Sequence, residues 1–208
     1  MTPRRRLLPE DRRAQLLDVA AAQFATYPYD DVAMDEIALR AGVSRALLYR
    51  YFRSKRDLFA AVYQQAADRL LAATTFDAKQ PLFPQVAAGL DAHLDYFVAN
   101  RNTVLAANRV LAGDPTIQAI ISGELGEIRD RLLQLRLLDE QARLLLSTVL
   151  MSWLTFVRTM CVEWLTHEAF SRAELRDICL GALQGAFDEA PILDLSHYLR
   201  GPTNTVGQ

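Results

Sequence analysis

The stretch AGVSRALLYRYFRSKRDL, residues 41–58, decides the fold. Gly42 separates two short segments of helical period, residues 34–41 and 44–52, and Ser44 stands where a helix N-cap is expected. Two short helices joined by a glycine-containing turn of about three or four residues form a helix-turn-helix. The stretch therefore predicts a helix-turn-helix near the amino terminus.

The second helix of this pair has one apolar and one basic side. Inward packing of Leu48 and Phe52 turns Arg45, Ala46 and Tyr49 outward, because each residue advances about 100° around a helix axis. An α-helix fits the DNA major groove, where Arg binds guanine edges and Ala contacts a thymine methyl, and the basic side therefore indicates a DNA-facing surface. A merely solvated basic surface is the alternative that the charges alone leave open.

The charge distribution supports a polyanionic partner for one end of the chain only. The 208 residues have a net charge of -2, but residues 1–56 carry +4 and residues 57–208 carry -6. With 51% hydrophobic and 23% charged residues, the composition excludes disorder as the default. A small basic head on a larger acidic, globular body is expected.

Helical period continues along the rest of the chain, and no strand pattern occurs. Capping residues are expected at Ser54 with Asp57, at Asp114 and at Ser171 with Glu174. The fold class predicted is all-α, with helices over residues 9–25, 55–74, 85–100, 103–113, 116–136, 139–167 and 171–189, and a loop over 75–84.

Several features predict a cytoplasmic protein without a membrane span. Cys161 and Cys179 lie in apolar helical patterns and are expected to be buried, reduced thiols. No signal peptide follows the basic amino terminus, because Pro9 and acidic residues interrupt the apolar run. The uncharged run 144–157 is shorter than the roughly 20 residues of a span, so a buried helix is expected.

An enzyme is the main alternative from another functional class, but the sequence carries no catalytic signature. His93, His167 and His197 lie on separate segments, and neither HExxH nor a glycine-rich phosphate loop is present. We expect no catalytic residues, no metal and no cofactor. A protein-protein adaptor, whose basic cluster binds an acidic partner, is a third hypothesis.

The chain over residues 12–62 resembles the amino-terminal DNA-binding region of the tetracycline-repressor (TetR) family of transcriptional regulators. The resemblance is carried by IALRAGVS, LYRYF and SKRDL within LLDVAAAQFATYPYDDVAMDEIALRAGVSRALLYRYFRSKRDLFAAV. It implies a three-helix DNA-binding domain over residues 1–53, a helical ligand-binding and dimerisation domain over 54–208, and a homodimer that reads a palindromic operator.

The resemblance also implies which residues contact double-stranded DNA. Lys55 takes a phosphate contact, and Arg50 is an added candidate. Arg4, Arg5 and Arg6 form either an arm that reaches the DNA or a disordered basic tail. The recognition-helix contacts fall on Ser44, Arg45, Ala46, Tyr49 and Tyr51.

The chain departs from the family pattern just before the second helix. Pro28-Tyr29 replaces a frequent Gly-Tyr, and Val32 and Ala33 replace frequent Thr and Ser residues. The missing hydroxyls remove a usual helix cap and a usual phosphate contact. Asp30 and Asp31 would repel DNA, so we expect them to point away or to cap the second helix.

The body is expected to hold a small, largely apolar effector that relieves repression, although activation or co-repression stays open. Pockets are mostly apolar with a few placed polar groups. Arg158 and Glu163 interrupt the most apolar helix and are expected to form structural ion pairs or exposed positions. Candidate ligand residues are His93, Tyr96, Phe97, Asn100, Asn108, Met151, Phe156 and Met160.

The last two long helices carry more apolar residues than one body is expected to hide. Surplus apolar faces imply a partner, and pairing both helices with their two-fold mates gives a four-helix bundle. Gly181, Ala182, Gly185 and Ala186 would permit close approach of helices. The expected homodimer interface contains Trp153, Trp164, Leu180, Leu183 and Phe187.

Overall fold

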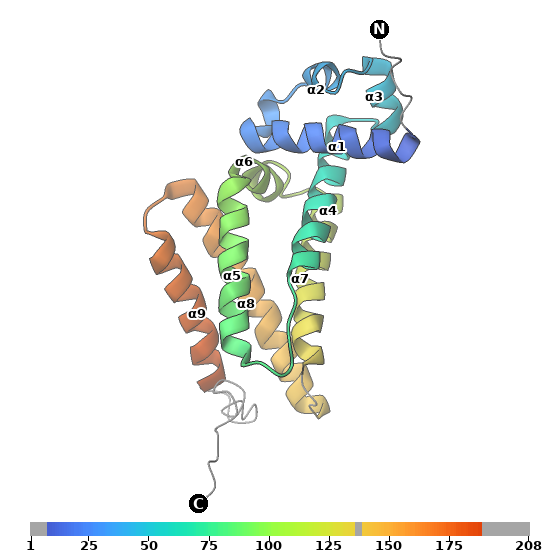
Figure 1. Ribbon diagram of the computed structural model, residues 1–208. Coiled ribbons are helices and arrows are strands. Elements are labelled where there is room, and N and C mark those ends of the chain that lie inside the picture. The colour runs from blue at the N-terminus through green and yellow to red at the C-terminus, as the bar shows by residue number, and fades with distance from the viewer. Residues whose placement is uncertain (1–7, 136–138, 189–208) are drawn as a thin grey trace, which may run out of the picture. The chain divides into compact units, whose positions relative to one another are not determined.

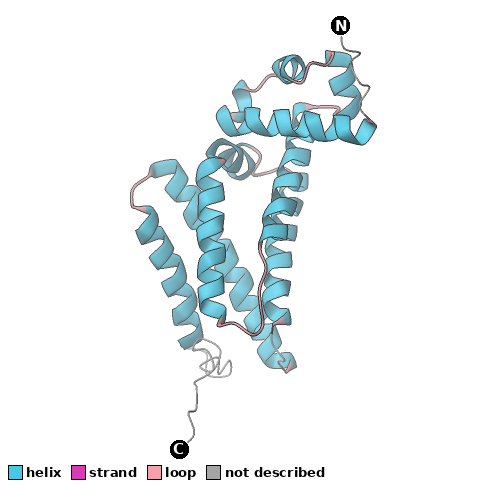
Figure 2. Cartoon of the chain, viewed as in Figure 1, coloured by secondary structure: helices cyan, strands magenta, loops and turns pink. Residues whose placement is uncertain are grey.

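The computed structural model describes residues 8–135 and 139–188, and within them the chain is helical with no strand (Figures 1 and 2). The all-α prediction is confirmed. The helices are α1 (Pro9–Thr26), η1 (Tyr29–Asp31), α2 (Met34–Arg40), α3 (Arg45–Tyr51), α4 (Lys55–Ala73), α5 (Leu82–Ala99), α6 (Arg101–Leu105), η2 (Ala106–Val110), α7 (Pro115–Gln134), α8 (Glu140–His167) and α9 (Arg172–Asp188).

The chain divides into two compact units, Met1–Asp68 with Ala99–Ile120, and Arg69–Val98 with Ile121–Gln208. The division falls within the continuous helices α4, α5 and α7, because each contributes residues to both units. The domain boundary predicted between residues 53 and 54 divides the chain by function, and it does not coincide with the division into compact units. This functional boundary stays a prediction.

The core of the first unit is built on α1. Leu16, Ala20 and Phe24 are fully or almost fully buried, as their spacing of four residues predicts. Phe24 meets the ring of Phe59 edge-on, with ring centroids 5.0 Å apart, and Tyr29 packs against Phe59 at 5.3 Å. This aromatic cluster joins the end of α1, η1 and the first half of α4.

The second unit contains α5, most of α7, α8, α9 and the end of α4. Helix α9 lies beside α5 in Figure 1, and the Nε atom of Arg176 donates to both carboxylate oxygens of Asp91, at 2.9 and 3.0 Å. Arg172 donates to Asp91 and, at 2.7 Å, to Asp95. The hydrocarbon core lies between α5, α7, α8 and α9 and includes Leu94, Phe97, Leu150, Cys161 and Leu183.

The caps predicted for three helices are present. The Asp57 amide donates to Ser54 Oγ at 3.1 Å, and the Ile117 amide donates to the Asp114 carboxylate at 3.1 Å. At α9, Ser171 and Glu174 form the reciprocal capping box, in which the Ser171 amide donates to Glu174 at 2.7 Å and the Glu174 amide donates to Ser171 Oγ at 3.2 Å.

Two helix boundaries differ from the prediction. Helix α5 begins at Leu82 instead of residue 85, because Pro84 falls in its first turn, where a missing backbone N–H costs no hydrogen bond. The single helix expected over 103–113 is α6 followed by a π-helical segment, η2. Leu111 N donates to Ala106 O at 2.9 Å, five residues back, which closes the wider turn.

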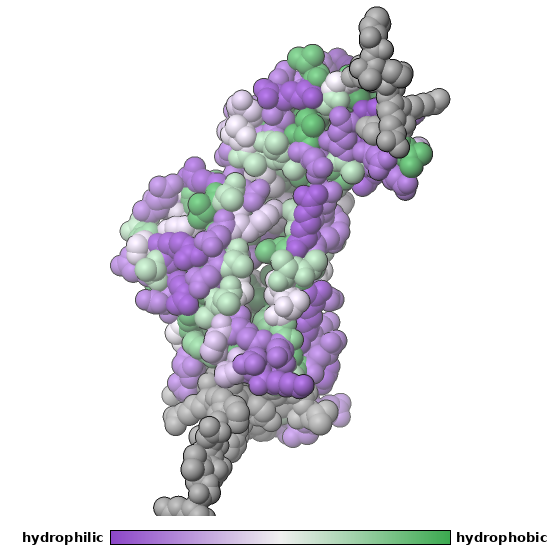
Figure 3. Space-filling model, in the orientation of Figure 1, coloured by the Kyte–Doolittle hydropathy of each residue, from purple (hydrophilic) through white to green (hydrophobic). Residues whose placement is uncertain are grey.

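Helix α8 is long and apolar enough, by length and composition alone, to cross a membrane. It is instead the central core helix of its unit: ten of its residues are buried, and they include the charged Arg158. A charged side chain at the middle of a bilayer would be costly, whereas here it has a buried ionic partner. Hydrophilic residues cover much of the face seen in Figure 3, with hydrophobic ones scattered between them.

Candidate nucleic-acid interface and internal cavity

The turn between α2 and α3 depends on Gly42. Its φ of 63° lies in the left-handed region that glycine adopts without strain. Gly42 N donates to Leu39 O at 3.0 Å, and Val43 N donates to Ala38 O at 3.0 Å, so the end of α2 is closed by backbone bonds. Ser44 then starts α3: its Oγ accepts the Leu47 amide at 3.2 Å, which confirms the predicted N-cap.

Helix α3 presents its two sides as the sequence predicts. Leu48 is 0% exposed and Phe52 is 4% exposed, and both face the core. The opposite side carries exposed Arg45, Ala46 and Arg50, while Tyr49 and Tyr51 are partly exposed. The predicted recognition residues of α3 are thus at least partly accessible to solvent, and their contacts with DNA stay a prediction.

Arg45 has an intramolecular partner that the sequence did not indicate. Its Nε lies 3.1 Å from Asp35 Oδ1, and its Nη1 donates to Asp35 Oδ2 at 3.1 Å. The guanidinium also lies 5.4 Å from the centre of the Tyr49 ring. Both charged groups are exposed, so the pair contributes little stability, but it fixes the direction of Arg45 on the α3 surface.

Lys55 fastens the start of α4 to η1. Its Nζ donates to Tyr29 O at 2.8 Å and to Asp30 O at 3.3 Å, and it lies 4.5 Å from the centre of the Tyr29 ring. An ammonium group has three donors, so a phosphate contact requires either the third donor or an exchange of partners. The phosphate contact of Lys55 stays a prediction, and its structural role was missed.

The departures before α2 remove a helix cap as expected, and one of the two alternatives for the nearby aspartates is excluded. Ala33 is the N-cap of α2 and makes no side-chain cap bond, as the missing hydroxyl predicts. Val32 is buried at 5% exposure. Asp30 and Asp31 do not cap α2, because η1 ends at Asp31 and the cap position falls on Ala33. Both aspartates are exposed.

Two contacts tie α1 and α4 to α6 and the start of α7 within the first unit. Arg56 pairs with Asp114, the N-cap of α7, and this contact raises the pKa of Arg56 and lowers the pKa of Asp114. The side-chain amide of Asn102, on α6, donates to Ala25 O at 3.1 Å. Through these contacts, the first turn of α4 is linked to the start of α7, and the end of α1 is linked to α6.

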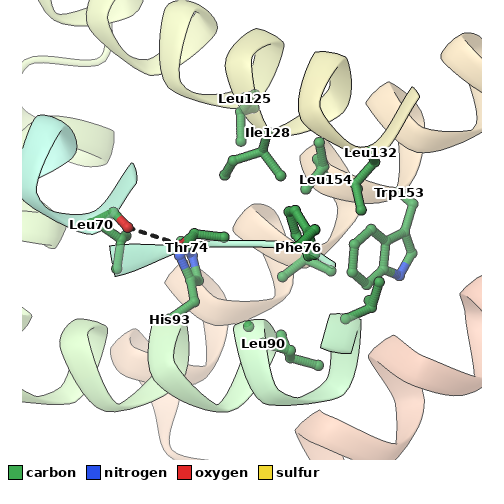
Figure 4. Close-up of a pocket in the computed structure, with 13 residues that line it drawn as sticks. Leu70, Thr74, Phe76, Leu90, His93, Leu125, Ile128, Leu132, Trp153 and Leu154 are labelled. Atoms are coloured by element: carbon green, nitrogen blue, oxygen red, sulfur yellow. Dashed lines mark hydrogen bonds between the residues drawn. The ribbon is translucent and has the colours of Figure 1, made fainter. Parts of the chain in front are cut away.

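The second unit contains a cavity among α4, α5, α7 and α8 (Figure 4). The cavity has a volume of about 60 Å³, and it is partly open to solvent. Leu125, Ile128 and Leu132 of α7 form one wall, and α5 forms the facing wall. The remaining lining residues are Leu70, Thr74, Phe76, Val86, Gly89, Leu90, His93, Trp153, Leu154 and Val157.

His93 is the titratable side chain on the described cavity wall. Burial, together with the nearby positive charge of Arg158, lowers the pKa of His93 to about 3. The imidazole is therefore neutral at physiological pH. Its ring lies 4.0 Å from the Phe97 ring, centre to centre, and the Arg158 guanidinium carbon lies 5.8 Å from the centre of the same Phe97 ring.

Arg158 forms a buried ion pair, as the structural interpretation of this residue predicts. Its Nη1 lies 3.7 Å from Glu124 Oε2, and both side chains are less than 10% exposed. Burial raises the pKa of Glu124, an effect that Arg158 partly offsets. Glu163, the other charge that interrupts this helix, is partly exposed and lies 3.4 Å from His167.

Of the eight predicted ligand residues, His93 alone lies on the described cavity wall. Phe97 is buried beside it, and Tyr96 is partly buried next to Phe97. Their contact with an effector stays a prediction, and the sequence did not separate them because aromatic and sulphur-containing side chains mark core and wall positions alike. The five others that do not line the cavity are Asn100 and Asn108, in the first compact unit, and Met151, Phe156 and Met160, elsewhere on α8.

The premise for the predicted dimer residues is also corrected. Trp153, Leu180, Leu183 and Phe187 are buried within the single chain, where they pack α8 against α9, so they are not surplus apolar surface. The Trp153 Nε1 donates to Cys179 O at 2.7 Å, and the same ring faces the cavity. Trp164 is partly buried, and its Nε1 donates to Phe170 O at 2.8 Å.

The exposed apolar surface of α9 lies on the side of the helix that does not pack against α8. Ile178 is 46% exposed, and Gly181, Ala182 and Gly185 follow it at helical spacing on the same exposed side. A Cβ atom at Gly181 or Gly185 would have nothing within 4 Å in the chain. On α8, exposed Leu144, Thr148, Ser152, Thr155 and Thr159 form a second stripe without charge.

Comparisons with known proteins agree on one family. Residues 16–62 match the family model of bacterial regulatory proteins, tetR family. The HTH-type transcriptional activator FasR of Mycolicibacterium smegmatis is 42% identical over 92 residues, which are 41% of this chain and 42% of FasR. A transcriptional repressor from Mycobacterium tuberculosis is 36% identical over 61 residues, 29% of this chain and 33% of the repressor. The chain thus matches less than half the length of these relatives.

The fold extends the likeness beyond the amino terminus. A tetR-family transcriptional regulator from Streptomyces coelicolor superimposes with a TM-score of 0.77 and 25% identity, over 91% of this chain and 86% of that one. The comparison proteins are transcriptional regulators, not enzymes. Residues 16–62, which contain the helix-turn-helix at α2 and α3, thus match the model of the TetR family of transcriptional regulators, and the helical fold of the chain is similar to that of a solved TetR-family regulator.

Proposed function

We propose that the protein is a cytoplasmic, dimeric repressor that binds a palindromic operator through α3 and is released by a small, largely apolar effector. One observation carries the proposal: α3 buries Leu48 and presents Arg45, Ala46 and Arg50 together on an accessible side. A short helix with this composition suits the major groove, where Arg and Ala contact base edges. Residues 1–53 supply the DNA-binding function, and residues 54–208 supply effector binding and dimerisation.

Dimerisation uses the exposed faces of α8 and α9 in this proposal. The stripe of Ile178, Gly181, Ala182 and Gly185 permits close approach of two helices, since the glycines leave open space beside the backbone. A two-fold axis pairs this face with its copy in an isologous interface. The dimer then holds two recognition helices about 34–36 Å apart, one turn of DNA.

The cavity in the second unit is the proposed effector site. It is mostly apolar, and the neutral His93 supplies a hydrogen-bonding group without a charge. An effector that binds one conformation of the dimer more tightly shifts the population toward it. In this proposal the favoured conformation has the wrong spacing of α3 helices for the operator.

A second candidate is an activator, which is favoured by the likeness of the amino-terminal region to a protein named as an activator. A reporter gene with a selected operator at its promoter separates the two. Deletion of the regulator raises reporter output if the protein represses and lowers it if the protein activates. Arg45→Ala is the matched variant, and it should reproduce the deletion.

The adaptor hypothesis is tested by competition. A labelled duplex selected by the protein is challenged with an excess of random duplex at constant salt, because salt-dependent binding alone does not distinguish DNA reading from charge attraction. Retention of the labelled duplex supports the proposed function. Equal displacement by random duplex would leave an acidic protein partner as the better explanation of the basic cluster.

A further inference from the structure

The effector cavity adjoins a more polar depression, which we call the polar mouth. Thr74, Thr75, Phe76, Arg131, Gln134 and Leu135 line it, and Thr74 and Phe76 also line the cavity. The two hollows therefore share part of their walls at the end of α4. Among the described residues that line either hollow, Arg131 carries the positive charge.

Arg131 currently holds the end of α4 against α7. Its Nη1 donates to Leu71 O and, at 2.9 Å, to Thr74 O, and its Nε donates to Glu127 Oε1 at 2.9 Å. These two carbonyls belong to the last turn of α4 and its exit, where the helix dipole is negative. About a third of the Arg131 side chain (32%) is exposed, so a ligand in the mouth can reach it.

The division between an apolar interior and a cationic mouth predicts the polarity of the ligand. The cavity wall offers hydrocarbon and a neutral imidazole, so an ionised group would lose its hydration there without compensation. At the mouth, the guanidinium can form paired hydrogen bonds to a carboxylate, and these are roughly twice as strong as bonds to a neutral carbonyl. Glu127 occupies Nε, whereas Nη1 binds the neutral carbonyls of Leu71 and Thr74, which a carboxylate can replace.

We propose that the effector is a carboxylic acid with an apolar tail, in which the tail fills the cavity and the carboxylate binds Arg131 at the polar mouth. This inference rests on the proposed function, because it takes the cavity to be the effector site. The carboxylate displaces Leu71 O and Thr74 O from the guanidinium. The last turn of α4 then loses its tie to α7, on the same helix whose first turn contains Lys55.

Binding is measured by quenching of Trp153 fluorescence, since this side chain lines the cavity. The background variant Trp164→Phe removes the other tryptophan of the chain. The probes are alkanoic acids that carry bromine near the tail end and the primary alcohols of the same chain length. Arg131→Gln removes the charge, Arg131→Lys retains it, and Arg129→Gln removes a neighbouring positive charge whose described partner is Asp130 rather than the mouth.

The acid should bind at least about tenfold more tightly than the alcohol. Hydrogen bonds to charged groups are stronger than bonds to neutral groups by enough to raise the affinity about tenfold. Arg131→Gln should remove this preference and leave the affinity for the alcohol unchanged. Arg131→Lys should retain part of it, and Arg129→Gln all of it. Thermal melts of each variant check that the fold is intact.

Three results would overturn the inference in distinguishable ways. Equal affinity for acid and alcohol, or a preference for the acid that survives Arg131→Gln, contradicts the role of Arg131 and leaves the apolar effector site standing. If Arg131→Gln does not fold, Arg131→Lys decides the same point: a preference for the acid that is as large in Arg131→Lys as in the parent contradicts a carboxylate paired with the guanidinium. No quenching by either probe would instead refute the cavity as effector site, and with it that part of the proposed function.

Discussion

The environment of His93 predicts a measurable dependence of stability on pH. Burial beside Arg158 lowers the pKa of His93 from 6.5 to about 3 in the folded protein. At pH values between about 3 and 6.5, the His93 imidazole binds a proton in the unfolded chain but not in the folded chain. The free energy of unfolding therefore falls as the pH is lowered through this window.

The size of the effect follows from the two pKa values. From pH 7 to pH 5 the unfolded imidazole becomes almost fully protonated while folded His93 stays neutral, and the difference amounts to about 2 kcal/mol at 1.36 kcal/mol per pKa unit. Glu124 has the opposite sign, because burial raises its pKa and the folded state gains its proton first. A comparison with a His93 variant separates the two groups.

The assay is urea unfolding at pH 7 and pH 5 of the parent and of His93→Phe, which retains a ring against Phe97. Between pH 7 and pH 5, the free energy of unfolding of the variant should fall by about 2 kcal/mol less than that of the parent. His167→Gln is the matched control for the loss of a histidine, because the side chain of His167 is 63% exposed and does not line the cavity. His93→Leu serves if the ring of the first variant distorts the cavity.

The reasoning would be refuted if the free energy of unfolding fell by the same amount between pH 7 and pH 5 in the parent and in both His93 variants. It would mean that His93 titrates near its ordinary pKa, and hence that water reaches the imidazole in the folded protein. The cavity would then be hydrated at His93, and the proposed neutral, apolar interior would be wrong.

Other predictions concern DNA, the core and the dimer. Arg45→Ala should weaken binding to a selected operator by about 1–3 kcal/mol in fluorescence anisotropy, and Tyr49→Ala should also weaken it, both without a change in sedimentation; unchanged affinity would contradict the assigned contacts. Arg158→Met should lower the free energy of unfolding by about 3–5 kcal/mol, because it leaves Glu124 buried without its partner, whereas adding Glu124→Leu should recover most of the loss. Equal destabilisation of the single and double variants would contradict this coupling. Ile178→Glu should convert the dimer to a monomer in sedimentation with little change in Tm, and a persistent dimer would place the interface elsewhere.

The helix-turn-helix could be predicted because its signals are local. A cap at Ser44, a break between two helices at Gly42 and the spacing of Leu48 and Phe52 each depend on neighbours in sequence. The structure confirms all three. The pairing of Arg45 with Asp35 was not foreseen, since it joins two helices whose relative orientation is set by the turn between them.

The cavity and the proposed dimer face could not be predicted in the same way, because both depend on which side of a helix other helices cover. Trp153 illustrates the difficulty: its apolar ring suggested an interface, yet it lies on the cavity wall with its N–H bonded to Cys179 O. The small, exposed residues Gly181 and Gly185 form the accessible face of α9 instead. Arg131 gave no signal in the sequence, since its partners are backbone carbonyls of another helix.

The most direct test of the central claim is selection of bound duplexes from a random library by the purified full-length protein, followed by sequencing. The account predicts enrichment of an inverted repeat whose half-site centres are about one helical turn, or about 10 base pairs, apart. Arg45→Ala should lose the enrichment. A well-folded dimer that enriches no sequence would contradict the account and would show that α3, despite its basic and accessible surface, does not read DNA.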